Sequence, residues 1–144
     1  MMKDLSAYKD LVYKIIGAAM NVHKELGYGL LEAVYNEALH IELLDMGIEN
    51  ESEKLLECYY KGRKLNKTYR MDIVVEDIIL ELKAVDQIMP EHRSQLFNYL
   101  RLTKKSIGLL LNFGQESLYG ERYYFDTQNN ECILLNKSLK QFYE

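Results

Sequence analysis

The stretch "YRMDIVVEDIILELKAV", Tyr69–Val85, decides the fold because it contains two apolar runs separated by a short acidic turn. Aliphatic and β-branched runs on either side of a tight turn predict an antiparallel hairpin. If Glu76 and Asp77 form the turn, residues equidistant from it face each other across the two strands. Asp72 and Glu81 each lie four residues from the near member of that turn. The sequence therefore predicts that the two carboxylates are cross-strand neighbours.

Neighbouring carboxylates in an apolar hairpin need a compensating charge. At a separation of about 5 Å and an effective dielectric of about 20, they repel each other by about 3 kcal/mol. Lys83 follows Glu81 by two residues and shares its face of the strand. A structural ion pair between Lys83 and Glu81 is one interpretation, but it leaves Asp72 without a role. The other interpretation is that Asp72 and Glu81 bind a divalent cation such as Mg²⁺ or Mn²⁺, which prefer oxygen ligands.

Two helices are predicted before this hairpin. The first begins near Ser6, which can cap it, and stops at Gly27. Its apolar residues recur at helical spacing and are Val12, Ile15, Ile16, Ala19, Val22 and Leu26. The second helix is expected over residues 30–46, with an apolar stripe made of Val34, Ala38 and Ile41.

The remaining elements predict an α/β fold. "EKLLECYY" indicates another strand before the hairpin, with a turn at Lys61–Gly62. "PEHRSQLFNYLRLTK" predicts a helix with Pro90 in its first turn, and "SIGLLLNF" predicts a buried central strand. That helix is a crossover, so "LELKAV" and "IGLLLNF" should be parallel neighbours. We expect "RYYFD" to be an edge strand and "CILLNKS" to be the last element.

The composition favours one globular domain spanning residues 1–144. About half of the residues are apolar (48%) and 28% are charged, which is an ordinary globular mixture. No run of about 18 apolar residues occurs, and the first residues lack the features of a signal peptide. Cys58 and Cys132 form no CxxC pair. We therefore expect reduced cysteines, no membrane span and a cytoplasmic protein.

Three motifs resemble those of a known family. Asp72, Glu81 and Lys83 match the D…ExK signature of the PD-(D/E)XK nuclease superfamily, and "GLLEAVY" (29–35) resembles the motif of the small bacterial GxxExxY family within it. "QLFNY" (95–99) resembles the QxxxY helix of the exonuclease-like members. The similarity extends from "IIGAAMNVHKELG" to "LLNFG", although Met71 stands where a Pro is usual. This resemblance implies a restriction-endonuclease-like fold, with a central mixed β-sheet flanked by α-helices.

The resemblance also implies a metal-dependent nuclease that hydrolyses phosphodiester bonds in DNA, or less readily in RNA. The implied ligands of Mg²⁺ or Mn²⁺ are Glu32, Asp72, Glu81 and the carbonyl of Leu82. Lys83 would position the attacking water or stabilise negative charge. Gln95 and Tyr99 lie one helical turn apart and would orient Lys83 or contact the substrate backbone. Taken without the resemblance, Glu32 is a favourable charge at a helix N-terminus and Tyr99 is a half-buried core residue.

Three further residues invite an interpretation. His23 is expected to support the loop between the first two helices, and His92 could line the same cleft as Gln95. Tyr35 shares a helix face with Glu32 and is expected to pack beside the pocket rather than to react.

Basic residues gather in one segment, although the net charge of the chain is −4. "KGRKLNKTYR" contains five basic residues and no acidic residue, whereas "IENESEKLLE" before it is acidic. The segment is either a solvated hairpin with charged edges or a patch that contacts phosphates. The residues expected to contact nucleic acid are Lys61, Arg63, Lys64, Lys67, Arg70, Arg93 and Arg101.

The acidic net charge also favours an alternative, in which the chain is a noncatalytic binding or regulatory module that keeps the nuclease fold. A homodimer or a protein partner fits either function, since a domain of 144 residues has few means to hold a long duplex alone. The intact Asp72, Glu81 and Lys83 favour the enzyme, because buried like charges have no use in a site that has lost its function.

Overall fold

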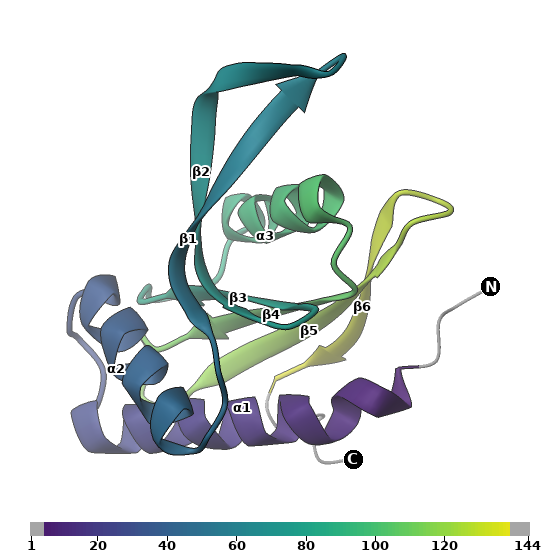
Figure 1. Cartoon of the computed structure of the whole chain (residues 1–144). Helices are drawn as coiled ribbons and strands as arrows, with labels where there is room; N and C mark the ends of the chain where they lie inside the picture. The colour runs from purple at the N-terminus through teal and green to yellow at the C-terminus, as the bar shows by residue number, and fades with distance from the viewer. Residues whose placement is uncertain (1–4, 139–144) are drawn as a thin grey trace.

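The hairpin predicted from Tyr69–Val85 lies in the middle of a six-stranded mixed sheet (Figure 1). This computed structural model describes residues 5–138. Strands β2 (Arg63–Val75) and β3 (Ile78–Lys83) are antiparallel, with Glu76 and Asp77 between them as expected. The paired residues are Val75–Ile78, Val74–Ile79 and Ile73–Leu80.

The crossover after β3 is also present. Helix α3 (Pro90–Thr103) connects β3 to β4 (Ile107–Asn112), and the two strands are parallel neighbours. Every residue of β4 is buried, which confirms the prediction of a central strand. α3 covers one face of the sheet, where the buried residues that form a common core include Ile79, Leu96, Tyr99, Leu100 and Leu110.

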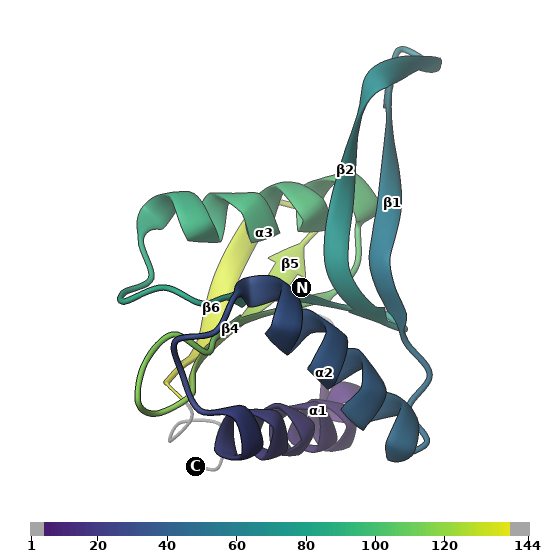
Figure 2. The same ribbon diagram turned by 90° about the vertical axis from the view of Figure 1, so that its left-hand side faces the viewer.

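Helices α1 (Ser6–Leu26) and α2 (Glu32–Asp45) cover the opposite face of the sheet (Figures 1 and 2). Their buried residues form a second core with β2, β3 and β4. Burying an aliphatic side chain of this kind stabilises the fold by about 1.5–3 kcal/mol. The fully buried aliphatic residues of this core include Ile15, Ile16, Leu39, Leu43, Ile73, Leu80 and Leu109. The sheet is therefore the middle layer of three.

The buried face of α2 differs from the predicted stripe. Val34 and Ile41 are 40% and 52% exposed, whereas Tyr35, Leu39 and Leu43 are fully buried. The ring of Tyr35 stacks on a core aromatic ring and fixes the rotation of the helix, which shifts the buried face by one residue. The start of α1 differs as well, because the helix begins at Ser6 and has no side-chain cap.

The prediction that "RYYFD" is an edge strand is wrong. β5 (Tyr119–Asp126) lies between β4 and β6 (Glu131–Lys137), and the edges of the sheet are β1 (Glu51–Tyr60) and β6. The consecutive aromatic residues of β5 are buried because β6 covers its outer edge and helices lie over both faces.

Two strands leave the body of the molecule together. β2 has 13 residues, but it pairs with β3 only through its last three. Before that point β2 pairs with β1 alone, out to the Tyr60–Arg63 pair next to the predicted turn. Figures 1 and 2 show this ribbon rising past α3. We call residues 55–70 the hairpin arm. Within residues 5–138, no helix is long and apolar enough to cross a membrane.

Candidate active site

The first acid of the predicted site, Asp72, lies where β2 separates from β3. The register continues to place Asp72 opposite Glu81, but the backbone ladder stops one pair earlier. Oδ2 of Asp72 instead accepts a hydrogen bond from the backbone N–H of Leu82 at 2.8 Å. A charged acceptor makes this bond stronger than a neutral one, so it fixes both the carboxylate and the end of β3.

Glu81 is buried on the α3 face with only 1% of its surface exposed. Its Oε1 is 4.0 Å from Nζ of Lys83, and its Oε2 has no hydrogen-bond partner among residues 5–138. Burial raises the pKa of Glu81 far above its ordinary value, and Asp72 raises it further by a hydrogen bond and by its charge. Two ionised carboxylates have no proton to share, so that bond exists only when one of them is protonated. Oε2 therefore needs a proton or a cation.

Lys83 connects the acidic residues of the site to helix α3 through a chain of hydrogen bonds. Its Nζ donates a hydrogen bond to Oε1 of Gln95 at 2.7 Å. The amide of Gln95 then donates to the hydroxyl of Tyr99 at 3.0 Å, and that hydroxyl donates to the backbone carbonyl of Arg70 at 3.1 Å. The i, i+4 pair expected from the sequence is thus a relay that holds the ammonium group. Gln95 therefore contacts Lys83 directly and Tyr99 contacts Gln95, which is the geometry that the first of their two expected roles requires.

Glu32 approaches the same site from the other layer. It is the first residue of α2, and it is half-buried. Desolvation raises the pKa of Glu32, the charge of Lys83 lowers it and the charge of Asp72 raises it. Glu32 in turn contributes to the raised pKa of Glu81. The three carboxyl groups and the ammonium group therefore interact electrostatically, although no hydrogen bond is found between Glu32 and the others.

Tyr35 explains how α2 reaches the site. Its hydroxyl donates to the carbonyl of Gly27 at 2.7 Å and accepts from the N–H of Leu30 at 3.2 Å. Its ring stacks on Phe113, which directly follows β4, at 4.9 Å between centroids. Gly29 adopts φ 99°, which a glycine accepts readily. The tyrosine thus packs as predicted, and it ties the α1–α2 loop to the sheet so that Glu32 starts the next helix.

The segment after Lys83 is held by residues that the sequence did not indicate. The side chain of Asn112 is fully buried and bonds both the N–H and the carbonyl of Val85, at 3.0 and 2.9 Å. Asn112 also accepts from the N–H of Gly114. A Cβ atom on Gly114 would overlap the backbone N and O of Val85. The "NFG" sequence after an apolar strand is the signal that could have indicated this close approach.

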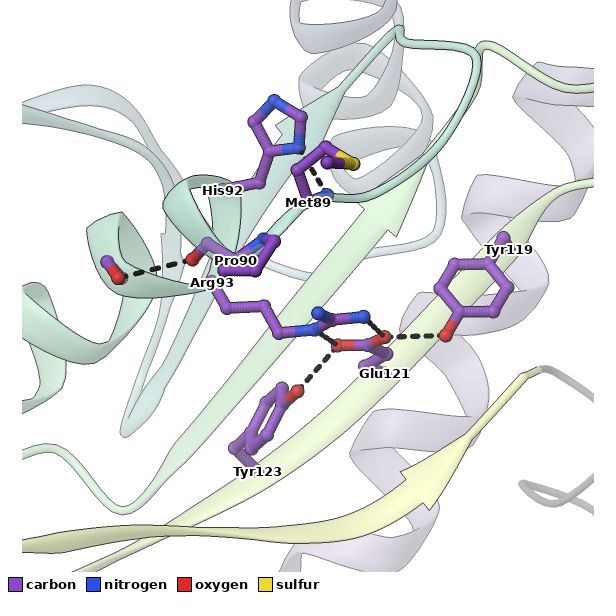
Figure 3. A network of polar contacts seen from close by, with 8 residues as sticks. Met89, Pro90, His92, Arg93, Tyr119, Glu121 and Tyr123 are labelled. Atoms are coloured by element: carbon purple, nitrogen blue, oxygen red, sulfur yellow. Dashed lines mark hydrogen bonds and ion pairs between the residues drawn. The ribbon is translucent and has the colours of Figure 1, made fainter.

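Arg93 has a different environment from the one expected of a phosphate contact. Its Nε and Nη2 each donate to Glu121 at 2.9 Å, so the pair is bidentate (Figure 3). The hydroxyl groups of Tyr119 and Tyr123 also donate to Glu121. The Arg93 pair lowers the pKa of Glu121 against the effect of burial, and the neighbouring carboxylate helps to raise the pKa of Tyr119 to about 12. This network anchors α3 on β5.

The two histidines have structural contacts. The ring nitrogen Nδ1 of His92 accepts from the N–H of Met89 at 2.9 Å, which caps the start of α3 (Figure 3). Nε2 of His23 lies 2.9 Å from the carbonyl of Gln115, in the loop after β4. His23 therefore supports a loop as expected, although it is a different loop, and His92 contacts no residue of the predicted site in these bonds.

The basic residues predicted on the hairpin lie on the arm, and all five are exposed. Lys61 lies over the ring of Tyr60, and Lys64 forms an ion pair with Glu57 at 3.1 Å. On the surface of α3, Arg101 contacts Asn98 at 3.5 Å. Of the seven basic residues expected to contact nucleic acid, five therefore lie on the arm and two on α3.

Two acidic side chains of the site could serve as ligands of a divalent cation. Asp72 and Glu81 supply oxygen atoms, and the partnerless Oε2 of Glu81 is the kind of atom that a cation satisfies. Within residues 5–138, however, no group of three or more His, Cys, Asp or Glu side chains is arranged to hold a metal ion. Asp72 and Glu81 can therefore supply two acidic ligands, but among the described residues no third acidic side chain lies close enough to both to complete a metal site.

Comparison with known proteins identifies the family. A family model described as the PD-(D/E)XK nuclease superfamily matches residues 9–123, which include the hairpin, the crossover and β4. No curated protein shows significant similarity. A solved structure described as "Crystal structure of SSO0001" is similar at 20% identity and a TM-score of 0.40, over 79% of this chain and 59% of that chain. The chain, with its mixed sheet flanked by helices in a restriction-endonuclease-like arrangement, therefore belongs to the PD-(D/E)XK nuclease superfamily.

Proposed function

We propose that this protein is a Mg²⁺- or Mn²⁺-dependent nuclease that hydrolyses phosphodiester bonds, with DNA as the first candidate substrate. One observation carries the proposal. Glu81 is buried beside Asp72 with an oxygen that has no hydrogen-bond partner within the described part of the chain, and Lys83 lies next to it with its ammonium group bonded to Gln95. Such a group has no evident structural use, because it must either keep a proton far above its ordinary pKa or stand as an unpaired buried charge, and both are costly. A site that binds a cation and a phosphate has a use for it.

The proposed cation ligands are Asp72, Glu81 and the carbonyl of Leu82, with Glu32 completing the set from α2. A bound divalent cation supplies a positive charge to the scissile phosphate and lowers the pKa of a nearby water. Asp72 supports the arrangement in a second way, because its bond to the N–H of Leu82 fixes the backbone at that point. Glu81 must be ionised to bind a cation, so binding releases a proton.

Lys83 has the proposed role of stabilising negative charge on the phosphate or of positioning the attacking water. Gln95 accepts from its ammonium group, and Tyr99 orients Gln95. This relay restricts Lys83 to one position before substrate arrives, so little conformational freedom is lost during the reaction.

Several finer assignments belong to the same proposal. The Gly29, Glu32 and Tyr35 motif supports a place in the GxxExxY branch of the superfamily. We also propose a single nuclease domain over residues 1–144, a cytoplasmic location and contact of the arm with nucleic acid. Arg93 would join that contact only by giving up part of its pair with Glu121. A homodimer remains a proposal for a substrate too long for one copy.

A second candidate is a noncatalytic module that binds nucleic acid through the same fold. It is favoured by the net charge of −4 and by the lack of a three-acid group within residues 5–138.

One experiment decides between the two. Labelled single- and double-stranded DNA and RNA are incubated with the protein and Mg²⁺, Mn²⁺ or EDTA. We expect cleavage that needs the metal and that falls by about 10²–10³-fold in Lys83→Ala, the usual effect of removing one charge-stabilising group. The matched control is Lys24→Ala, an exposed lysine near the end of α1. Cleavage that survives Lys83→Ala would come from a contaminant, and binding without cleavage under every condition would favour the noncatalytic module.

A further inference from the structure

The hairpin arm has a surface that the core does not explain. Tyr59 and Tyr60 are 60% and 62% exposed near its tip, and Leu55, Leu65 and Tyr69 are exposed along it. Two-stranded ribbons are at best marginally stable without a packed face. Exposed aromatic rings gathered on such an element indicate a binding surface.

The rings of the arm alternate with cations. Nζ of Lys61 lies 5.4 Å from the ring centre of Tyr60, and Nζ of Lys67 lies 5.4 Å from that of Tyr69. Each pair places a flat aromatic face beside an ammonium group. This combination suits a ligand that carries flat bases and phosphates together, because bases stack on the rings while the cations contact the phosphates.

The root of the arm is connected to the candidate active site. The ring of Tyr69 contacts the ring of Tyr99 edge to face, with 5.9 Å between the centroids. Tyr99 is the residue that orients Gln95, and Gln95 holds Lys83. A strand lying along the arm would therefore arrive beside the ammonium group that we assign to the reaction.

We propose that the hairpin arm binds a single-stranded nucleic acid and leads it to Lys83. This inference rests on the proposed function and names its substrate class. The stacking faces are those of Tyr60 and Tyr69, which the strand register places on the same side of the ribbon. The phosphate contacts come from Lys61, Arg63, Lys67 and Arg70. Lys64 contributes less, because Glu57 already neutralises it.

A single strand fits the arm better than a duplex or a second copy of the chain. The bases of a duplex are stacked on one another, so they offer no face to a tyrosine ring, whereas unpaired bases do. Two arms that paired with each other would bring two sets of basic residues together, and like charges across strands are destabilising.

The proposal is tested by fluorescence anisotropy in EDTA, which prevents metal-dependent cleavage. The probes are oligothymidylate, oligouridylate and a blunt DNA duplex of equal length. We expect the wild-type protein to bind both single strands more tightly than the duplex, by about tenfold. The substitution Tyr60→Ser should weaken single-strand binding by about tenfold and leave duplex binding unchanged. Comparison of the two single strands shows whether DNA or RNA binds more tightly.

The matched control is Tyr13→Ser, which removes a tyrosine 59% exposed on α1, far from the arm in sequence. It should bind as the wild-type protein does. Tyr69→Leu keeps an apolar side chain beside Tyr99, removes the stacking face, and should also weaken single-strand binding. Circular dichroism and thermal melting verify that each variant is folded.

Three results overturn the inference. The first is equal affinity for strand and duplex, and the second is unchanged binding in the folded arm variants. The third is a dimer, detected by light scattering, that the arm substitutions dissociate without changing nucleic-acid affinity.

The inference about the arm and the proposed reaction can fail separately. Loss of cleavage in Lys83→Ala together with normal binding by the arm variants would reject the role of the arm alone. Strand binding through the arm with no cleavage in any metal would reject the proposed reaction alone.

Discussion

Glu81 and Glu121 form a natural comparison within one sheet. Both pair with Leu110 of β4, one from β3 and the other from β5, so their side chains share the α3 face. Each is 1% exposed. Glu121 accepts two bonds from Arg93 and one from each of two tyrosines. Glu81 has a lysine at 4.0 Å and an oxygen without a partner among the described residues.

The two residues show how a buried carboxylate that serves only the packing of the fold differs from one that is available for chemistry. The environment of Glu121 lowers its pKa, whereas that of Glu81 raises the pKa, mainly by burial and then by Asp72. The same sheet face can therefore satisfy a buried carboxylate fully. The unsatisfied state of Glu81 is a property of its position beside Asp72 and Lys83, and perturbed groups of this kind gather at functional sites.

The largest expected difference between the two glutamates is in hydrolysis. Glu81→Gln should lower the metal-dependent cleavage rate by at least about 10²-fold, because it removes a proposed cation ligand. Glu121→Gln keeps the shape of the side chain and one of its two acceptor oxygens, and should lower the rate by less than about fivefold. Rates are measured with the labelled substrates described above. Equal losses in the two variants would show that Glu81 acts only through the packing of α3.

The next largest difference is in stability. Glu121→Gln should lower the free energy of unfolding by about 3 kcal/mol, because Arg93 loses its buried charged partner. Glu81→Gln should raise it by about 1–3 kcal/mol in EDTA at pH 8, since the wild-type protein must either take up a proton on Glu81 when it folds at that pH or bury its charge, and the amide needs neither. Guanidinium denaturation measures both values. Destabilisation by both substitutions would mean that Glu81 already has a compensating partner.

The third expected difference between Glu81 and Glu121 is in how the free energy of unfolding depends on pH. A carboxyl whose pKa is raised in the folded state favours folding below its ordinary value of 4.5, and this contribution is lost as pH rises. In EDTA, the stability of the wild-type protein should therefore fall above about pH 5, by up to about 1.4 kcal/mol per pH unit. Glu81→Gln should flatten this decline. Glu121 has a lowered pKa and acts in the opposite sense, so its contribution is lost only as pH falls.

The smallest expected effect is stabilisation by a cation. At about ten times its dissociation constant, Mg²⁺ or Mn²⁺ adds about 1.4 kcal/mol. This should raise the melting temperature of the wild-type protein and of Glu121→Gln by a few degrees. Asp72→Asn should show almost no shift. Equal shifts in Asp72→Asn and the wild-type protein would remove the assignment of Asp72 as a ligand.

The features that the sequence predicted well depend on short-range geometry. A two-residue turn fixes the hairpin register, so the positions of Asp72 and Glu81 follow from counting. One helical turn brings Gln95 to Tyr99, and a helix between two apolar strands makes those strands parallel. The ligand role of Glu32 and the Leu82 carbonyl stays a prediction, because it concerns a bound state.

The features that the sequence did not predict depend on contacts between distant segments. The rotation of α2 follows from the stacking of Tyr35 on Phe113, 78 positions later, and periodicity alone favoured another face. The pair of Arg93 with Glu121 joins a helix to a strand 28 residues away, so Arg93 could only be interpreted as a surface cation. The covering of β5 by β6 is a matter of strand order. Local patterns contain none of this information.

The close approach of Gly114 to Val85 has a consequence for variation in this chain. With no room for even a methyl group there, the loop after Lys83 lies against the end of β4 at a fixed distance. Any larger residue would push that loop outward and carry the lysine's own backbone with it. Gly114 should therefore tolerate substitution poorly, although it is not one of the proposed site residues. A mutational scan would find an inactivating position there, in a surface loop that sequence alone would rate as expendable.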